Sequence, residues 1–225
     1  MADGSNQRDA LKASRLGTIF DVDFAQAIQR GTMDYRYKGV PTLKCPFDLA
    51  IYQELIWDLK PATILEFGSY KGGSALWLAD LLRAYGLETT RLLTMDIHSM
   101  HEISDPRVEF VQCDVNNIAA SLSDEMMSQL AHPFLVIEDS SHKAPHVRKV
   151  MDFFHEHSRP GDYLIVEDGI LSLIMDETEF EGGPLAAIHA FMAAHPDAYE
   201  IDRERCDRYG RNATWNLDGY IRRIK

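Results

Sequence analysis

The sequence predicts an α/β fold with a mostly parallel sheet and helices on both of its faces. Short apolar runs alternate with segments of helical periodicity, and the first run ends in a glycine-rich loop that enters a helix. The chain has 225 residues, of which 45% are hydrophobic, enough for one domain to bury a full core. No repeat or Pro/Gly/Ser-rich linker divides it. We expect a partly disordered N-terminal extension over residues 1–33 and a single domain over 34–225.

The elements follow from local patterns. Residues 45–60 form a predicted helix, because Tyr52, Leu55, Ile56 and Leu59 follow helical spacing and Pro46 suits a first turn. The closing segments 198–203 and 214–221 resemble two strands without a helix between them, a pair that could end the sheet antiparallel. The remaining predictions are strands over 63–67, 91–95, 108–112, 134–138 and 163–166, and helices over 75–86, 118–130, 145–157 and 185–194.

Composition and charge limit the classes of partner. A net charge of −12 repels nucleic acid and anionic lipid, and the main basic cluster is the tail Arg222, Arg223 and Lys225. No apolar run approaches the roughly 20 residues that span a bilayer, and the polar first residues lack a signal-peptide core. The cysteines are odd in number and far apart, which argues against a disulfide framework. We expect a cytoplasmic protein whose partner is a small molecule.

Acidic residues collect where the predicted strands end. Ligands of open α/β sheets bind beyond the carboxyl ends of the strands, so the chemistry is expected there. The acids at these ends are Glu66, Asp96, Asp114, Asp139, Glu167 and Asp168.

A glycine-rich loop, E-F-G-S-Y-K-G-G-S over residues 66–74, follows the first strand. Glycines let a ligand approach the backbone, and the helix N-terminus offers free amides to an anionic group, although an ordinary tight turn would have the same composition. The loop matches neither G-x-G-x-x-G nor a P-loop, which weakens the hypothesis that the ligand is a nicotinamide cofactor or a nucleoside triphosphate. Asp96, ending the second strand, suits a ribose diol. Together these features favour an adenosine-containing ligand.

These motifs resemble a known family. The loop is similar to the first motif of class I S-adenosylmethionine (SAM)-dependent methyltransferases, closest to the cation-dependent O-methyltransferases. With G-V-P-T-L-K-C-P-F-D at 39–48 and N-L-D-G-Y at 216–220, it resembles the cephalosporin hydroxylase family, related to macrolide-sugar O-methyltransferases. The similarity covers roughly residues 34–225. It implies a Rossmann-like, seven-stranded, mostly parallel sheet with an antiparallel closing strand, an N-terminal helical extension and a homo-oligomer.

The resemblance also implies cofactor contacts. Glu66 and Gly68 would line the methionine portion of SAM, with Ser69 in the same loop, and Tyr70 would back the sulfonium. The other implied contacts are Ser74 to the carboxylate of SAM, Asp96 to the ribose and Asp114 to the adenine amino group. For Asp114, a surface helix cap is an equal alternative.

Three carboxylates, Asp139, Glu167 and Asp168, end two apolar strands that we expect to be neighbours. Without a bound cation, these carboxylates would repel one another. A hard cation such as Mg²⁺ prefers oxygen ligands and leaves coordination positions open for substrate. The alternative is that each is a solvated loop residue. The positions match the metal ligands implied by the resemblance, and match the macrolide-sugar branch better than the catechol branch. Strand alternation points the competing acid Glu138 to the opposite face.

His142 lies three residues after Asp139 and is the expected general base. An imidazole, with an ordinary pKa of about 6.5, can accept the proton of a hydroxyl at neutral pH. The related enzymes carry a basic residue at this position, and Lys143 is the nearby alternative.

The leading hypothesis is a SAM- and Mg²⁺-dependent O-methyltransferase in secondary metabolism, such as antibiotic biosynthesis, acting on a sugar hydroxyl or another chelating oxygen. Methylation of a carboxylate, a SAM-binding partner of an oxygenase and a nucleotide-binding oxidoreductase are the alternatives. Candidate acceptor contacts are Tyr35, Tyr37 and the acidic segment 176–183, whose Gly182 and Gly183 could hinge a lid.

Overall fold

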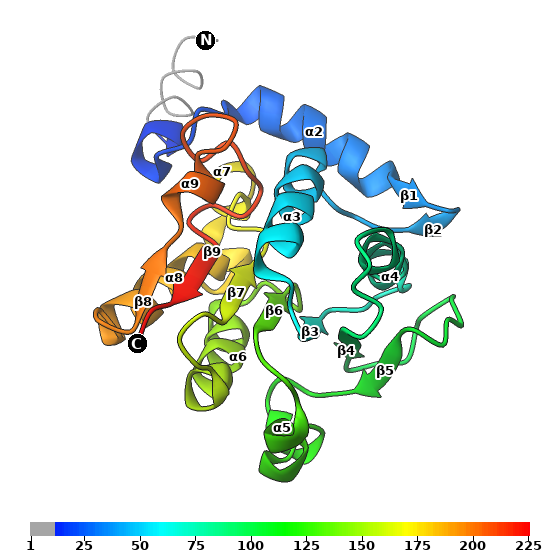
Figure 1. Ribbon diagram of the computed structural model, residues 1–225. Helices are drawn as coiled ribbons and strands as arrows, with labels where there is room; N and C mark the ends of the chain where they lie inside the picture. The colour runs from blue at the N-terminus through cyan, green and yellow to red at the C-terminus, as the bar shows by residue number, and fades with distance from the viewer. Residues whose placement is uncertain (1–11) are drawn as a thin grey trace, which may run out of the picture.

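The computed structural model describes residues 12–225 and has a central sheet between two layers of helices (Figure 1). Seven strands lie in the order β5-β4-β3-β6-β7-β9-β8, and β9 runs antiparallel to both of its neighbours. The Rossmann-like prediction with an antiparallel closing strand is therefore confirmed. The strands are β3 (Thr63–Phe67), β4 (Arg91–Asp96), β5 (Glu109–Gln112), β6 (Phe134–Glu138), β7 (Tyr163–Val166), β8 (Tyr199–Ile201) and β9 (Tyr220–Arg223).

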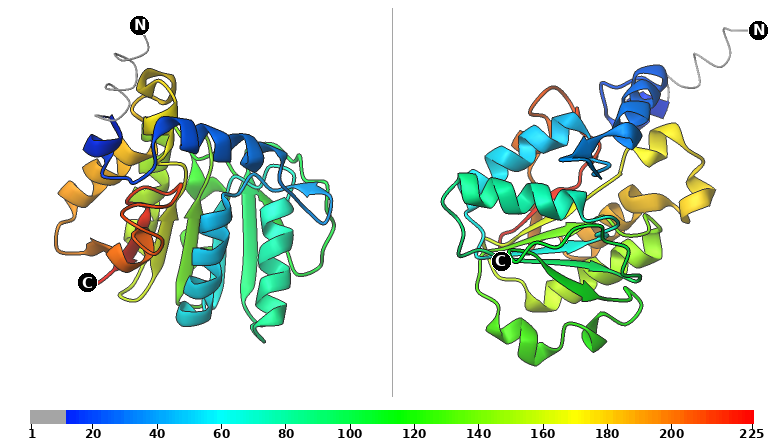
Figure 2. Two further views of the ribbon diagram at one scale, coloured as in Figure 1. Left: turned by 90° about the horizontal axis from the view of Figure 1, so that it is seen from above. Right: turned by 90° about the vertical axis from the view of Figure 1, so that its right-hand side faces the viewer.

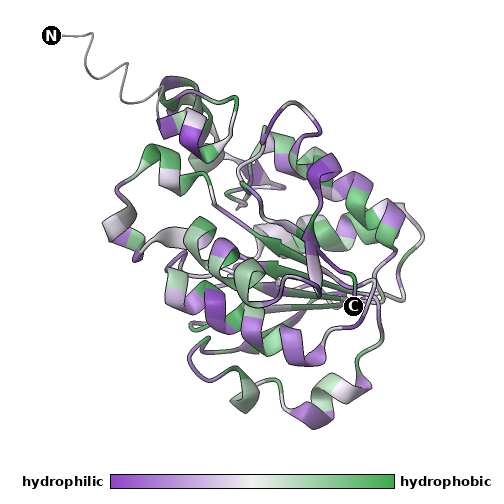
Figure 3. Cartoon of the chain, turned by 90° about the vertical axis from the view of Figure 1, so that its left-hand side faces the viewer, coloured by the Kyte–Doolittle hydropathy of each residue, from purple (hydrophilic) through white to green (hydrophobic). Residues whose placement is uncertain are grey.

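Helices cover both faces of the sheet because neighbouring strand residues point to opposite sides. Ile64 packs into one apolar cluster with α3 (Pro46–Leu59) and α4 (Gly73–Ala84), whereas Leu65 packs into another on the opposite face. The central strands β3 and β6 are buried along their whole length, and the strands at the centre of Figure 3 are largely hydrophobic. The second face is covered by α5 (Asp124–Gln129), α6 (Ala144–His157) and α8 (Gly183–Ala194).

The N-terminal helix α2 (Val22–Asp34) crosses the edge of the sheet where the parallel strands end (Figure 2). Its Ala25 joins a third apolar cluster with Leu173 of α7 (Leu171–Ile174) and with Trp215 and Leu217 of the loop before β9. The hairpin of β1 (Arg36–Tyr37) and β2 (Val40–Pro41) and the short helix η2 (Glu177–Phe180) complete this edge. The expected helical extension is present, and it covers the carboxyl ends of the strands.

The single helix predicted over 118–130 is wrong. The segment forms a short 3₁₀ helix, η1 (Ile118–Ala120), followed by α5. The Ser123 side chain accepts a hydrogen bond from the Met126 backbone N–H and so begins a new helix inside the predicted one.

The closing segment also differs from its prediction. A four-residue helix, α9 (Arg203–Cys206), lies between the last two strands, because the Asp202 side chain accepts from the Arg205 N–H and caps a helix start. The last strand begins at Tyr220 instead of residue 214. Gly219 lies so close to the backbone of Val166 that an added Cβ would be 2.1 Å from its carbonyl oxygen. The residues before it form a loop that reaches the strand ends.

Among residues 12–225, no helix is long and apolar enough to cross a membrane. The expected disorder of the first residues falls on residues 1–11, outside the described part of the chain.

Candidate active site

The register of the parallel strands places their ends side by side. Phe67, the last residue of β3, pairs with Met95 of β4 and with Glu138 of β6, and Glu138 pairs with Val166 of β7. The residues that follow these positions therefore emerge at one level of the sheet. Because β3 has a parallel neighbour on each side, with connections leaving in opposite directions, this edge is the switch point where α/β sheets bind ligands.

Two cavities meet at this edge. The larger, about 380 Å³, lies beneath α2 and reaches from the glycine-rich loop to the acids of β6 and β7. The smaller, about 200 Å³, is mostly apolar, and its lining includes Phe67, Met95, Ile97 and Cys113. Both cavities are lined by Gly68, Asp96 and Ser140, so they adjoin past the end of β3, and the pair of cavities is called the channel below.

The glycine-rich loop is shaped by the neighbouring backbone. Gly68 has a φ of +101°, and an added Cβ would lie 1.9 Å from the carbonyl oxygen of Asp139. Tyr70, at a φ of +41°, donates its backbone N–H to Asp96 Oδ2 at 3.0 Å. Glycine at 68 is thus required by the chain itself, where the sequence suggested only the approach of a ligand.

The expected cofactor residues divide into two groups. Ser69, Tyr70, Ser74 and Asp96 line the larger cavity, and Asp114 lines the smaller one. Asp114 also accepts from the Asn116 N–H at 2.8 Å, but this bond lies in a turn and does not cap a helix, because the next helix, η1, has Asn117 as its N-cap.

Glu66 is fully buried and lines neither cavity. Its Oε2 accepts from the Thr94 hydroxyl at 2.6 Å, whereas its Oε1 has no hydrogen-bond partner among residues 12–225. Burial raises the pKa of Glu66, against the opposing charge of Lys44. The free oxygen is a buried acceptor beneath the loop.

Three side chains could hold a metal ion. One ligand atom each from Asp139, His142 and Asp168 lie within 4.8 Å of one another, and all three residues are half-buried. His142 Nε2 lies 3.4 Å from Asp168 Oδ2. Asp168 has a φ of +60°, and its backbone N–H donates to Asn216 Oδ1 at 3.2 Å, which holds the strained residue in place.

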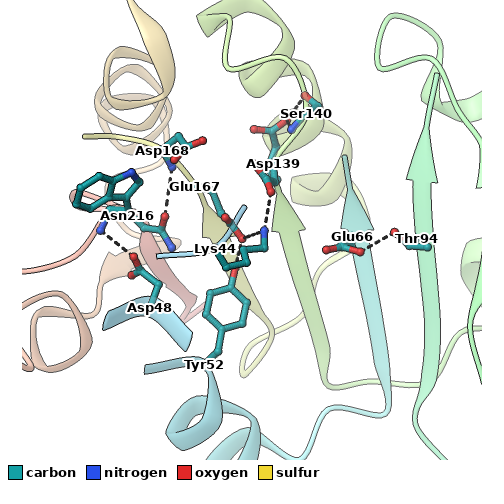
Figure 4. A network of polar contacts seen from close by, with 12 residues as sticks. Lys44, Asp48, Tyr52, Glu66, Thr94, Asp139, Ser140, Glu167, Asp168 and Asn216 are labelled. Carbon is teal, nitrogen blue, oxygen red and sulfur yellow. Dashed lines mark hydrogen bonds and ion pairs between the residues drawn. The ribbon is translucent and has the colours of Figure 1, made fainter. Parts of the chain in front are cut away.

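Glu167, the third expected ligand, points to a different partner (Figure 4). Its Oε1 accepts from Lys44 Nζ at 2.6 Å and from the Tyr52 hydroxyl. Lys44 Nζ also lies 2.5 Å from Asp139 Oδ2, so one buried ammonium joins two of the three expected ligands. The structure therefore gathers Asp139 and Asp168 with His142, and holds Glu167 against Lys44.

The charges of the site are strongly coupled. Burial raises the pKa values of Asp139 and Asp168, opposed most by Lys44 for Asp139 and by His142 for Asp168. Burial would lower the pKa of His142, but the charges of Asp168 and Asp139 outweigh it and raise the pKa above its ordinary value. Carboxylates this close together favour the binding of an added positive charge, whether a proton or a cation.

Of the two candidate bases, only His142 faces the acids. Lys143 Nζ is exposed and pairs with Glu181 at 2.9 Å. Glu138 is buried, accepts from Ser140 and lines neither cavity, and burial raises its pKa to about 7.

The acceptor contacts were the least predictable part of the site. Tyr37 donates to Asp80 and lines neither cavity, and Tyr35 lies outside the lining as well. Phe180 of the acidic segment does line the larger cavity, with its ring edge-on to His142 at 6.0 Å. The wall residues that sequence reasoning missed are Gln29, Thr32 and Met33 of α2, and Leu43, Leu171 and Met175. No local motif marks them, because distant elements bring them together.

A family model described as Rhamnosyl O-methyltransferase/CmcI matches residues 29–224. The rhamnosyl O-methyltransferase of Mycobacterium tuberculosis is 32% identical over 182 residues, which cover 77% of this chain and 73% of that protein. The rhamnosyl O-methyltransferase of Mycobacterium leprae is 29% identical over 191 residues, covering 82% and 81%.

Solved structures of CmcI share the fold. An apo structure superposes with a TM-score of 0.69 at 25% identity, covering 86% of this chain and 77% of that chain. A CmcI structure with Mg and SAM gives a TM-score of 0.66 at 27% identity, covering 86% and 78%.

Proposed function

Because the chain belongs to the rhamnosyl O-methyltransferase/CmcI family, we propose that it transfers the methyl group of SAM to a hydroxyl of a sugar-type small molecule, with a divalent cation. The observation that carries this proposal is the juxtaposition of the SAM-sized channel with Asp139, His142 and Asp168.

The channel suits SAM along its length. The apolar smaller cavity, with Asp114 in its wall, matches an adenine ring and its amino group. Asp96, which lines both cavities, is placed for the ribose diol, and Ser74 in the first turn of α4 is placed for an anionic carboxylate. Glu66 lies beneath the loop and lines neither cavity, so the SAM contacts proposed here are those of Asp96, Asp114 and Ser74.

The acidic cluster suits a hard divalent cation such as Mg²⁺. Asp139 and Asp168, in the wall of the larger cavity, would supply carboxylate oxygens, and Glu167, which does not line this cavity, would add the oxygen that does not accept from Lys44. A bound cation would lower the pKa of an acceptor hydroxyl and orient it. CmcI, a relative with a similar fold, has been solved with Mg and SAM.

His142 is the proposed catalytic base. Its Nε2 faces Asp168 at the cavity wall, where an acceptor hydroxyl would lie. It would take the hydroxyl proton as the carbon–sulfur bond of SAM breaks and the new carbon–oxygen bond forms. Without a bound cation, the charges of Asp168 and Asp139 raise the pKa of His142 above its ordinary value. The remaining wall, from α2 to Phe180, excludes water and aligns the acceptor.

Two measurements test this function. Isothermal titration should show SAM binding and no NAD binding, and a panel of sugars, polyols and phenols should yield an O-methylated product with labelled SAM. SAM binding without transfer to any acceptor would instead support a SAM-binding partner of an oxygenase, and NAD binding would support an oxidoreductase. Transfer only to carboxylic acids would support the carboxylate alternative.

A further inference from the structure

Lys44 is a buried cation within the acidic cluster. Only 6% of its side chain is exposed, and Nζ lies 2.5 Å from Asp139 Oδ2 and 2.6 Å from Glu167 Oε1. Burying an ammonium group without a partner is costly, so its two carboxylates are what make this position tolerable. Both acids emerge from neighbouring strands, β6 and β7, and Lys44 comes from the segment that leads into α3 (Figure 4).

The surroundings hold Lys44 at this position. It lies directly before Cys45, the N-cap of α3, and after Leu43, whose φ is +38°. Tyr52, in the middle of α3, is buried, and its hydroxyl donates to the same oxygen of Glu167. The ammonium is therefore fixed between the carboxylates and is not a surface lysine that swings through solvent.

We propose that Lys44 is an internal counter-ion that holds Asp139 and Glu167 in place without a divalent cation and weakens cation binding at this site. A fixed positive charge repels a second cation bound by the same carboxylates, and it occupies one oxygen of each. Cation affinity in proteins depends on the net charge of the ligands. The inference rests on the proposed function, because it requires a cation at Asp139 and Asp168.

Two neutral variants test the proposal. Lys44→Met removes both the charge and the hydrogen bonds, whereas Lys44→Gln keeps N–H donors, so it also serves if the first variant does not fold. Lys38→Met is the matched control, since Lys38 is exposed and pairs with Asp80. Affinity for Mn²⁺ is measured by titration on chelator-treated protein, and the unfolding temperature is measured with EDTA and with Mn²⁺.

Both neutral variants should bind Mn²⁺ at least ~10-fold more tightly than the wild type. In EDTA they should unfold at a lower temperature, because the buried carboxylates lose their counter-ion, and Mn²⁺ should raise that temperature more than it does in the wild type. Lys38→Met should change neither quantity beyond experimental error.

The outcomes separate this inference from the proposed function. Wild-type binding of Mn²⁺ with equal or weaker binding by both neutral variants would overturn the role of Lys44 and leave the cation site standing. No Mn²⁺ binding by the wild type or by either variant would overturn both. Mn²⁺ binding by the two neutral variants and not by the wild type would support the counter-ion role most strongly, because Lys44 would then prevent cation binding.

Discussion

His142 Nε2 faces Asp168 Oδ2 at 3.4 Å, and the other ring nitrogen is buried without a hydrogen-bond partner among residues 12–225. This contact joins the proposed base to the proposed cation site. It brings an imidazole from the loop after β6 to an acid from the end of β7, so a hydroxyl beside this pair would be within reach of both.

Replacing His142 should slow chemistry without weakening SAM binding. For His142→Gln we expect kcat to fall by about 10² to 10⁴, the usual contribution of a general base. Single-turnover methyl transfer measures the chemical step, and isothermal titration measures SAM affinity. His189→Gln, at an exposed position paired with Asp218, is the control. Unchanged transfer in His142→Gln would favour a carboxylate acceptor, which needs no base.

Replacing either paired acid should weaken cation binding. Asp139→Asn and Asp168→Asn each remove one negative charge from the site, and we expect Mg²⁺ affinity to fall by at least about tenfold. Titration of Mg²⁺ against transfer rate, with a direct Mn²⁺ titration, measures the change. Asp124→Asn changes an exposed acid outside the site. If Asp139→Asn and Asp168→Asn bind the cation as tightly as the wild type and Asp124→Asn do, the cation does not bind at these acids.

Asn216 should act as a positioning residue for Asp168. It accepts the Asp168 backbone N–H at 3.2 Å and is itself 1% exposed. Asn216→Ala leaves a donor unpaired, so we expect a loss of about 1–3 kcal/mol in the free energy of unfolding. Cation affinity and kcat per folded molecule should also fall, which a purely structural role would not produce. Normal cation affinity in the folded fraction would contradict the positioning role.

Asp48 should make stability depend on pH. Burial raises its pKa to about 6, even though Thr214, Trp215 and Tyr220 donate to it. A folded-state pKa above the unfolded value of about 3.9 means that the folded state holds the proton longer. The stability contributed by Asp48 is therefore greatest below about pH 4 and is lost as the pH rises through about 6.

Urea unfolding, measured at several pH values between 4 and 7, tests the direction of this pH dependence. Relative to Asp48→Asn, the wild type should lose up to about 3 kcal/mol of unfolding free energy across this range, which is the free-energy equivalent of the shift. Parallel pH profiles for the two proteins would show that Asp48 does not titrate in this window. Asp58→Asn, on the exposed face of α3, controls for the loss of one surface charge.

The sheet was predictable because its strands are continuous apolar runs of ordinary length. Runs such as those of β3 and β6 are buried along their whole length, so composition alone marks them. The errors fell where a single polar side chain decides the structure. Ser123 and Asp202 each cap a helix that apolar periodicity does not reveal.

The candidate site was predictable where it follows strand ends and where the glycine-rich loop marks it. Asp96, Asp139 and Asp168 could be located because parallel strands end at one edge of the sheet. Lys44 carried no such signal, since it lies far from these acids in sequence and in a segment without periodicity. The same holds for Met33 and the other residues of α2, because only tertiary packing brings that helix across the sheet.

The most direct test of the account is methyl transfer by the wild type after removal of bound metal. EDTA should abolish transfer to a sugar hydroxyl, Mg²⁺ should restore it, and SAM should remain bound throughout. Transfer that continues at the same rate in protein shown by elemental analysis to be metal-free would contradict a cation-dependent reaction at Asp139 and Asp168.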